Sequence, residues 1–99
     1  MSFVTTNPEA VASAAGDVQS IGAAINAANV LAAATTSAVV PAAGDPVSLW
    51  TATQFRAHAH LYQVVANQAT AIHGRLVAAL STTADSYSST ESANAATAG

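Results

Sequence analysis

The fold is decided by one long stretch, residues 46–80, which reads PVSLWTATQFRAHAHLYQVVANQATAIHGRLVAAL. It begins with Pro46 directly after Asp45, a pair that is typical of the first turn of a helix. At about 100° per residue, its apolar side chains and one histidine fall on one face, with Leu61 at the edge. The members of this face are Val47, Phe55, His58, Tyr62, Val65, Ala69, Ile72, Leu76 and Leu80. The pattern predicts an amphipathic helix from about residue 46 to about residue 84.

A first helix is predicted upstream, beginning at Asn7-Pro8-Glu9. Asparagine caps helix starts, proline fits the first helical position, and an acid favours the positive end of the helix dipole. The apolar positions that follow have an alternating spacing of three and four residues: Val11, Ala14, Val18, Ile21, Ile25, Ala28 and Ala32. The pattern fades near residue 35, and Val40 before Pro41 favours extended backbone. We therefore expect a helix over about 8–35 and a loop over about 36–45.

A loop this short makes the two helices antiparallel neighbours. The predicted fold is all-α, a single domain over residues 1–99 made of an antiparallel two-helix hairpin. Alanine at the contact positions and Gly22 beside the first stripe permit a close approach of the helix axes. Beyond the second helix we expect a small, polar tail over about 85–99, whose last residues fray.

Two helices form only one layer, and this chain has little with which to build a core. Alanine accounts for 27 of the 99 residues, which leaves few large apolar side chains. Part of each apolar stripe must then face outward, and chains this small rarely fold alone without a stabilising device. The sequence therefore predicts a partner chain with which the hairpin completes a four-helix bundle. A second copy of the same chain is the alternative occupant.

Composition excludes several classes of function. Two arginines, no lysine and five acids give a net charge of −3, which does not suit binding to nucleic acid or to anionic lipid. The absence of cysteine excludes disulfides and thiolate metal sites. The N-terminus lacks the pattern of a cleavable signal peptide. Polar residues interrupt the most apolar stretch, residues 10–34, so no membrane-spanning helix is expected.

No catalytic or metal-binding pattern is apparent. His58 and His60 are roughly 200° apart around a helix, and His73 lies about 20 Å further along it, so the three cannot hold one ion. We expect His58 at an interface and His60 in water. No set of serine, histidine and acid converges, and no glycine loop could cradle a phosphate. The sequence predicts neither an enzyme nor a protein with a cofactor or a small-molecule substrate.

Trp50 has two possible roles on the sequence alone. It is either an exposed anchor for a partner or bulk that covers the start of the second helix.

Six segments together resemble the mycobacterial PE family. They are the N-terminal Ser2-Phe-Val-Thr-Thr-Asn-Pro-Glu-Ala, which holds Pro8 and Glu9, the loop segment 39–48, the helical segments Ala52-Thr-Gln-Phe-Arg-Ala-His58, Tyr62-Gln63 and Ala71-Ile-His73, and Tyr87-Ser-Ser-Thr-Glu91. The last fits the Tyr-x-x-x-Asp/Glu signal of type VII secretion substrates. The resemblance covers essentially the whole chain. It departs from the family at Pro46, where an acid is common, and at Leu49-Trp50, where smaller residues are usual.

The resemblance implies a fold and a role. A PE domain pairs with a PPE-family protein, a chaperone grips that partner, and the folded heterodimer leaves the cell through a type VII system. We therefore expect a non-enzymatic subunit, secreted or on the cell surface. Pro8 and Glu9 would be the family signature, and Tyr87 and Glu91 the secretion signal. The expected partner interface comprises Val11, Val18, Ile21, Ile25, Phe55, Tyr62, Val65, Ile72, Leu76 and Leu80. A self-associating bundle and a membrane-active surface or porin component are the alternatives.

Overall fold

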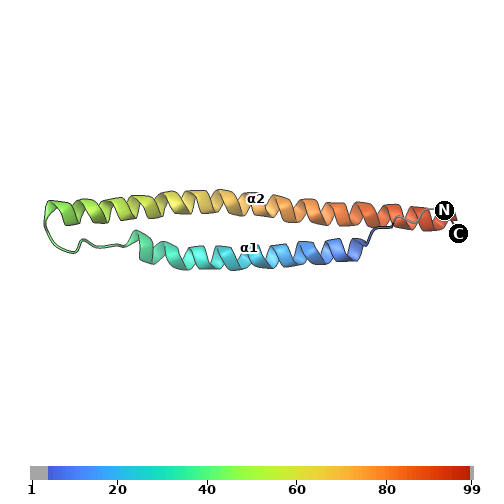
Figure 1. Cartoon of the computed structure of the whole chain (residues 1–99), viewed down its shortest axis with the longest axis horizontal. Helices are drawn as coiled ribbons and strands as arrows, with labels where there is room; N and C mark the ends of the chain where they lie inside the picture. Colours follow the sequence, from blue (N-terminus) through green and yellow to red (C-terminus); the bar gives the residue numbers. More distant parts are fainter. Residues whose placement is uncertain (1–4, 99) are drawn as a thin grey trace. The chain divides into compact units, whose positions relative to one another are not determined.

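The computed structural model describes residues 5–98, which form two α-helices, α1 (Pro8–Ser37) and α2 (Pro46–Ala98) (Figure 1). They contribute to two compact units. We call residues 23–71 the loop-end unit, and residues 5–22 with 72–98 the terminal unit. The prediction of an all-helical chain with two helices is confirmed, whereas the four-helix bundle with a partner stays a prediction. Residues 1–4 and 99, which belong to the predicted domain, lie outside the described residues.

Both helices begin with the same local chemistry. At the start of α1, Asn7 Oδ1 accepts a hydrogen bond from the backbone N–H of Ala10 at 3.1 Å. At the start of α2, Asp45 Oδ1 accepts one from the backbone N–H of Ser48 at 2.9 Å, and Asp45 Oδ2 accepts one from Ser48 Oγ at 2.8 Å. The two bonds from Ser48, the backbone one foremost, lower the pKa of the Asp45 carboxyl. Each cap satisfies N–H groups that have no partner within the helix.

The end of α2 differs from the sequence prediction. The helix continues to Ala98, whereas the sequence predicts its end near residue 84 and a tail beyond. Neither proline nor glycine occurs between residues 75 and 98 to interrupt it. The hydroxyls of Thr83, Thr90 and Thr97 each donate to the carbonyl four residues earlier. Hydroxyl groups satisfied in this way are compatible with a continuing helix, so polar composition alone does not end it.

The contact between α1 and α2 is closest at small side chains, with larger ones half-buried among them. On α2 the less exposed positions recur every seven residues, with a second row beside them, as in a coiled coil. We call these positions of both helices the seam. Its members on α2 are Ala52, Ala59, Gln63, Ala66, His73, Val77, Leu80, Ala84 and Glu91, and on α1 they are Pro8, Val11, Ala15, Val18, Gly22, Asn29, Ala32 and Ala33. The buried apolar residues among those described are all alanine: Ala15, Ala52, Ala59 and Ala84.

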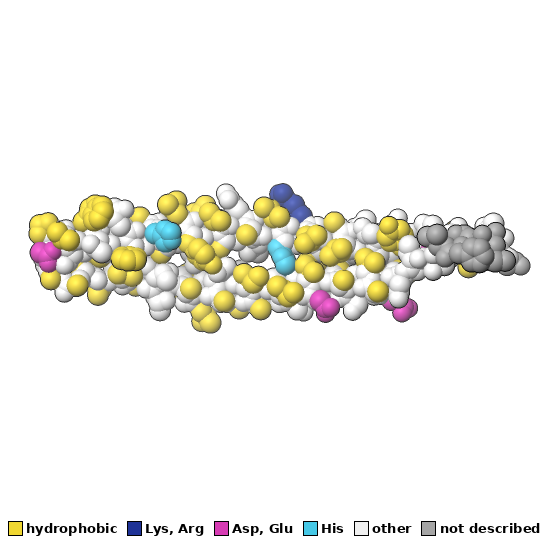
Figure 2. Space-filling view, viewed as in Figure 1, with side chains coloured by type: hydrophobic (Ala, Val, Ile, Leu, Met, Phe, Trp, Pro, Cys, Tyr) yellow, Lys and Arg dark blue, Asp and Glu magenta, His cyan; other side chains and the backbone are white. Residues whose placement is uncertain are grey.

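A seam of alanine leaves most of the large apolar side chains at the surface (Figure 2). The sequence predicts that part of each apolar stripe faces outward, and the exposure of these side chains agrees with that prediction. Over residues 5–98, neither helix has a segment long and apolar enough to cross a membrane.

Candidate functional site

Seven of the ten residues predicted as a partner interface are exposed, and we call them the exposed stripe: Ile21, Ile25, Phe55, Tyr62, Val65, Ile72 and Leu76. On α2 they follow a regular rule. Val65 and Ile72 each precede a seam residue by one position, and the other three each follow a seam residue by three. Both offsets lie on the same side of the seam. A residue three positions after a seam residue is rotated around the helix by about 300°, which equals about −60°, and a residue one position before it is rotated by about −100°. Within each unit, the stripe residues of α2 therefore flank the seam on one side.

The other three predicted interface residues, Val11, Val18 and Leu80, are half-buried and belong to the seam of the terminal unit. Their packing against the other helix of this chain uses part of their apolar surface.

In the loop-end unit, one asparagine of α1 joins two consecutive residues of α2. Asn29 Oδ1 accepts a hydrogen bond from Tyr62 Oη at 2.8 Å, and the Asn29 backbone carbonyl accepts one from Gln63 Nε2 at 3.1 Å. The phenol of Tyr62 is thereby satisfied while its ring stays about half exposed. The ring can contact a second protein without leaving a polar atom unsatisfied.

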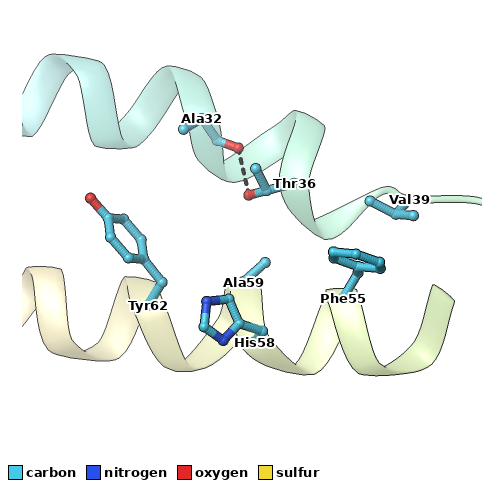
Figure 3. A pocket seen from close by; sticks show the side chains of 7 residues that line it. All are labelled: Ala32, Thr36, Val39, Phe55, His58, Ala59 and Tyr62. Carbon is cyan, nitrogen blue, oxygen red and sulfur yellow. Dashed lines mark hydrogen bonds between the residues drawn. The ribbon is translucent and has the colours of Figure 1, made fainter. Parts of the chain in front are cut away.

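A pocket of about 340 Å³ opens between the helices of the loop-end unit (Figure 3). Its lining comprises Ala32, Thr36, Val39, Phe55, His58, Ala59 and Tyr62. The rings of Phe55 and Tyr62 rise from α2 on either side of Ala59. The Thr36 hydroxyl already donates to the Ala32 carbonyl at 2.7 Å, and the phenol of Tyr62 is bonded to Asn29. With its hydroxyls engaged, the pocket suits an apolar group of the size of a large side chain.

His73 occupies the seam of the terminal unit, a position that the sequence analysis does not assign to it. Its Nε2 donates to the backbone carbonyl of Val18 at 2.5 Å, and its ring lies where a Cβ of residue 22 would be. Only glycine at position 22 leaves room for the ring in this arrangement. The signal that could have identified His73 is the seven-residue repeat that contains Ala59, Ala66 and Leu80.

The other two histidines are placed differently. His58 lines the pocket of the loop-end unit, and His60 is exposed. Within the described part of the chain, no three histidine, aspartate or glutamate side chains lie close enough together to hold a metal ion.

Tyr87 and Glu91 lie on consecutive turns of α2 in the terminal unit. Tyr87 is 42% exposed, and Glu91 is half-buried. The carboxylate of Glu91 is engaged, because its Oε1 accepts hydrogen bonds from the backbone N–H and the hydroxyl of Thr6 at 3.1 and 3.0 Å. The motif in the sequence singles out Tyr87 and Glu91, but the contact with Thr6 has no signal in the sequence.

The first turn of α1 holds Pro8 and Glu9, which the sequence analysis singles out as a family signature. Pro8 is half-buried at the first helical position, and the Glu9 side chain is exposed.

Trp50, in the first turns of α2, is 66% exposed. Of its two possible roles, this exposure favours an anchor over a cover.

Comparison with known proteins places the chain in a family. The family model described as "PE family" matches residues 4–94. The PE family protein PE13 of Mycobacterium tuberculosis is 54% identical over 98 residues, which cover 99% of this chain and 99% of that protein. The PE-PGRS family protein PE_PGRS8 of the same species is 49% identical over 96 residues, 97% of this chain and 55% of that protein. A ubiquitin-binding protein of the species is 47% identical over 94 residues, which are 95% of this chain and 25% of that protein. These matches confirm the resemblance seen in the sequence: the chain belongs to the PE family.

Proposed function

We propose that this chain is a non-enzymatic interaction subunit that pairs with a PPE-family protein, its two helices completing a four-helix bundle. The observation that carries the proposal is the exposed stripe. Large apolar side chains gathered on one side of the seam mark a protein interface, because isolated exposed apolar residues are common but aligned ones are not. Ile72, Val65 and Phe55, at 62, 61 and 60% exposed, are the stripe residues with the largest exposed fractions that a partner could bury.

The presence of two separate sets of residues on α2, the seam and the exposed stripe, supports a bundle geometry. The seam serves the contact with α1, and the exposed stripe is next to it on one side. A helix in a four-helix bundle contacts two neighbours through adjacent faces, which is the arrangement that these two sets of residues provide. The pocket beside Phe55 and Tyr62 would receive a large apolar side chain of the partner.

The second part of the proposal is export through a type VII system to the cell surface or the medium. Tyr87 and Glu91 support it because α2 continues to Ala98 and therefore holds the ring and the carboxylate one helical turn apart. The chaperone of this route would act through the PPE-family partner, so no chaperone site is assigned to this chain.

The test of the interface uses two adjacent valines of the loop-end unit. Val65 belongs to the exposed stripe, and Val64 points about 100° away from it around α2. Val65→Asp should abolish co-purification with the partner, because burying an uncompensated carboxylate costs at least several kcal/mol. Val64→Asp makes the same chemical change outside the stripe and should leave the yield of complex nearly unchanged.

The measurement is affinity co-purification from the native cell, with the captured protein identified by mass spectrometry. Equal capture by both variants would overturn the stripe as the interface. Capture of a second copy of this chain in place of a PPE-family protein would replace the heterodimer by a self-associating bundle.

Export is tested by Tyr87→Ala. We expect a normal yield of complex in the lysate and little or no protein in the culture medium and surface extract, because Tyr87 is partly exposed rather than buried. Undiminished export would remove the assignment of Tyr87 to a secretion signal, and loss of the complex in the lysate would make Tyr87 a packing residue.

A further inference from the structure

The contact between Thr6 and Glu91 joins residues that are 85 positions apart in the sequence. Thr6 precedes α1, and Glu91 lies in the last turns of α2, both in the terminal unit. Thr6 donates two hydrogen bonds, and both end on one carboxylate oxygen, Glu91 Oε1. Hydrogen bonds to an ionised acceptor are about twice as strong as neutral ones, so this pair fixes the orientation of a long side chain that would otherwise rotate freely.

The geometry leaves a defined surface for a second protein. With Oε1 engaged by Thr6, Glu91 Oε2 can accept from another donor, and the partly exposed ring of Tyr87 lies one helical turn away on the same helix. A carboxylate whose rotamer is already fixed is recognised at a smaller cost in conformational entropy than a mobile one.

We propose that Thr6 is a positioning residue for the secretion signal, which is therefore composite: Thr6 holds Glu91 so that Oε2 and the Tyr87 ring are presented together. The fitting surface on the recognising protein has a cationic or N–H donor beside an apolar patch. This inference rests on the proposed assignment of Tyr87 and Glu91 to export.

The contact makes the signal dependent on folding. Thr6 and Glu91 come from opposite ends of the sequence, and they meet only when the terminal unit has formed. An unfolded or half-assembled chain would still contain tyrosine and glutamate at the right spacing, but its glutamate would lack the donors that orient it.

The test compares two neighbouring threonines in the full chain, co-expressed with its partner. Thr6→Val keeps the shape of the side chain and removes the hydroxyl donor, whereas Thr5→Val makes the same change at a residue outside the contact. Thr6→Ser retains the donor. We expect Thr6→Val to lower the exported fraction several-fold with an unchanged complex yield in the lysate, while Thr5→Val and Thr6→Ser export normally.

A second variant addresses the other side of the contact. Glu91→Asp keeps a carboxylate four residues after Tyr87 but shortens its reach toward Thr6 by one methylene. It should lower export as Thr6→Val does, and the double variant should be hardly worse than either single one, since both changes weaken the same contact.

The contact itself is measured independently of export by amide hydrogen exchange in the purified complex. The Thr6 amide should be protected in the wild type and should exchange several-fold faster in Glu91→Ala.

Three results would overturn the positioning role. They are normal or increased export of Thr6→Val, additive losses in the double variant, and an equal exchange rate of the Thr6 amide with and without the Glu91 carboxylate. If Thr6→Val exports normally while Glu91→Ala does not, the secretion signal stands without the positioning residue. If Glu91→Ala is also exported normally, the assignment of the signal fails, and the positioning role fails with it.

Discussion

The loop-end unit and the terminal unit use the same two helices but hold them together differently. In the loop-end unit the buried seam residues are Ala52 and Ala59, and polar side chains from α2 reach Asn29 of α1. In the terminal unit a histidine ring is inserted against a glycine, and Val77 and Leu80 are half-buried. Both units have two buried alanines and hydrogen bonds between segments distant in the sequence, and the terminal unit adds larger half-buried side chains to its seam.

The two units also differ in the side chains that they expose at their surfaces. The loop-end unit leaves Phe55, Tyr62 and Val65 about half exposed or more and opens a pocket beside two of them. The terminal unit also exposes Ile72 and Leu76. In addition it has the hydrogen-bonded contact between Thr6 and Glu91, which contributes no apolar surface for binding. In the function that we propose, the apolar surface of the loop-end unit would bind the partner, and the polar contact of the terminal unit would serve the secretion signal.

The largest effect within the chain is expected at Gly22 of the terminal unit. Gly22→Ala introduces a Cβ that overlaps the His73 ring, so the ring or the helix must shift. Overpacking of this kind costs about 1–3 kcal/mol and exceeds the gain in helix propensity. Thermal unfolding of the co-purified complex, followed by circular dichroism, measures the change.

Gly16 provides the matched control, since a Cβ there meets nothing within 4 Å. Gly16→Ala should raise stability by about 0.5–1 kcal/mol through helix propensity. In a His73→Ala background, Gly22→Ala should no longer destabilise. A persistent loss in that background would show that the close contact at Gly22 is not with the His73 ring.

A smaller effect is expected at Tyr62 of the loop-end unit. Tyr62→Phe keeps the ring and removes the hydrogen bond to Asn29, which should lower stability by about 0.5–1 kcal/mol. The effect should vanish when Asn29 is already replaced by alanine, and a double-mutant cycle on the same melting curves gives this coupling. Full additivity of the two changes would indicate that the hydrogen bond contributes nothing to the loop-end unit.

The smallest effect is the pH dependence of the cap at the start of α2. The pKa of the Asp45 carboxyl is lowered from 3.8, with the hydrogen bonds from Ser48 as the main cause. A lowered folded-state pKa means that the stabilisation is complete above the unfolded pKa and is lost as the pH falls through the folded one. Melting temperatures measured from pH 6 downward should show the wild type losing its advantage over Asp45→Asn only below about pH 4. A difference between the two that does not change with pH would exclude an ionised cap.

The sequence predicts much of the fold because the signals involved are local. The caps at Asn7 and Asp45 and the prolines that follow them place both helix starts. The end of α2 could not be predicted in the same way. Serine and threonine are read as weak helix formers, and their bonds to carbonyls one turn earlier depend on a helix that already exists.

In the candidate site too, local patterns could be predicted from the sequence, whereas contacts between distant residues could not. The periodic apolar residues identify the exposed stripe, and Tyr87 and Glu91 follow from a motif. The seven-residue repeat indicates His73 as a seam residue, but neither its pairing with Gly22 nor the contact of Thr6 with Glu91 could be predicted, since each joins residues that are distant in the sequence.

By itself the sequence determined the two helices, the family and the surplus of apolar side chains over what one hairpin can bury, because propensity, capping and periodicity act over a few neighbouring residues. Only the tertiary structure decided which residues form the seam and which remain exposed. An apolar stripe is compatible with several rotations of one helix against the other, and the rotation adopted buries alanine and exposes the larger residues. Small side chains at the seam allow the helix backbones to approach closely, and the bulky ones are left at the surface, where a second protein can bind them.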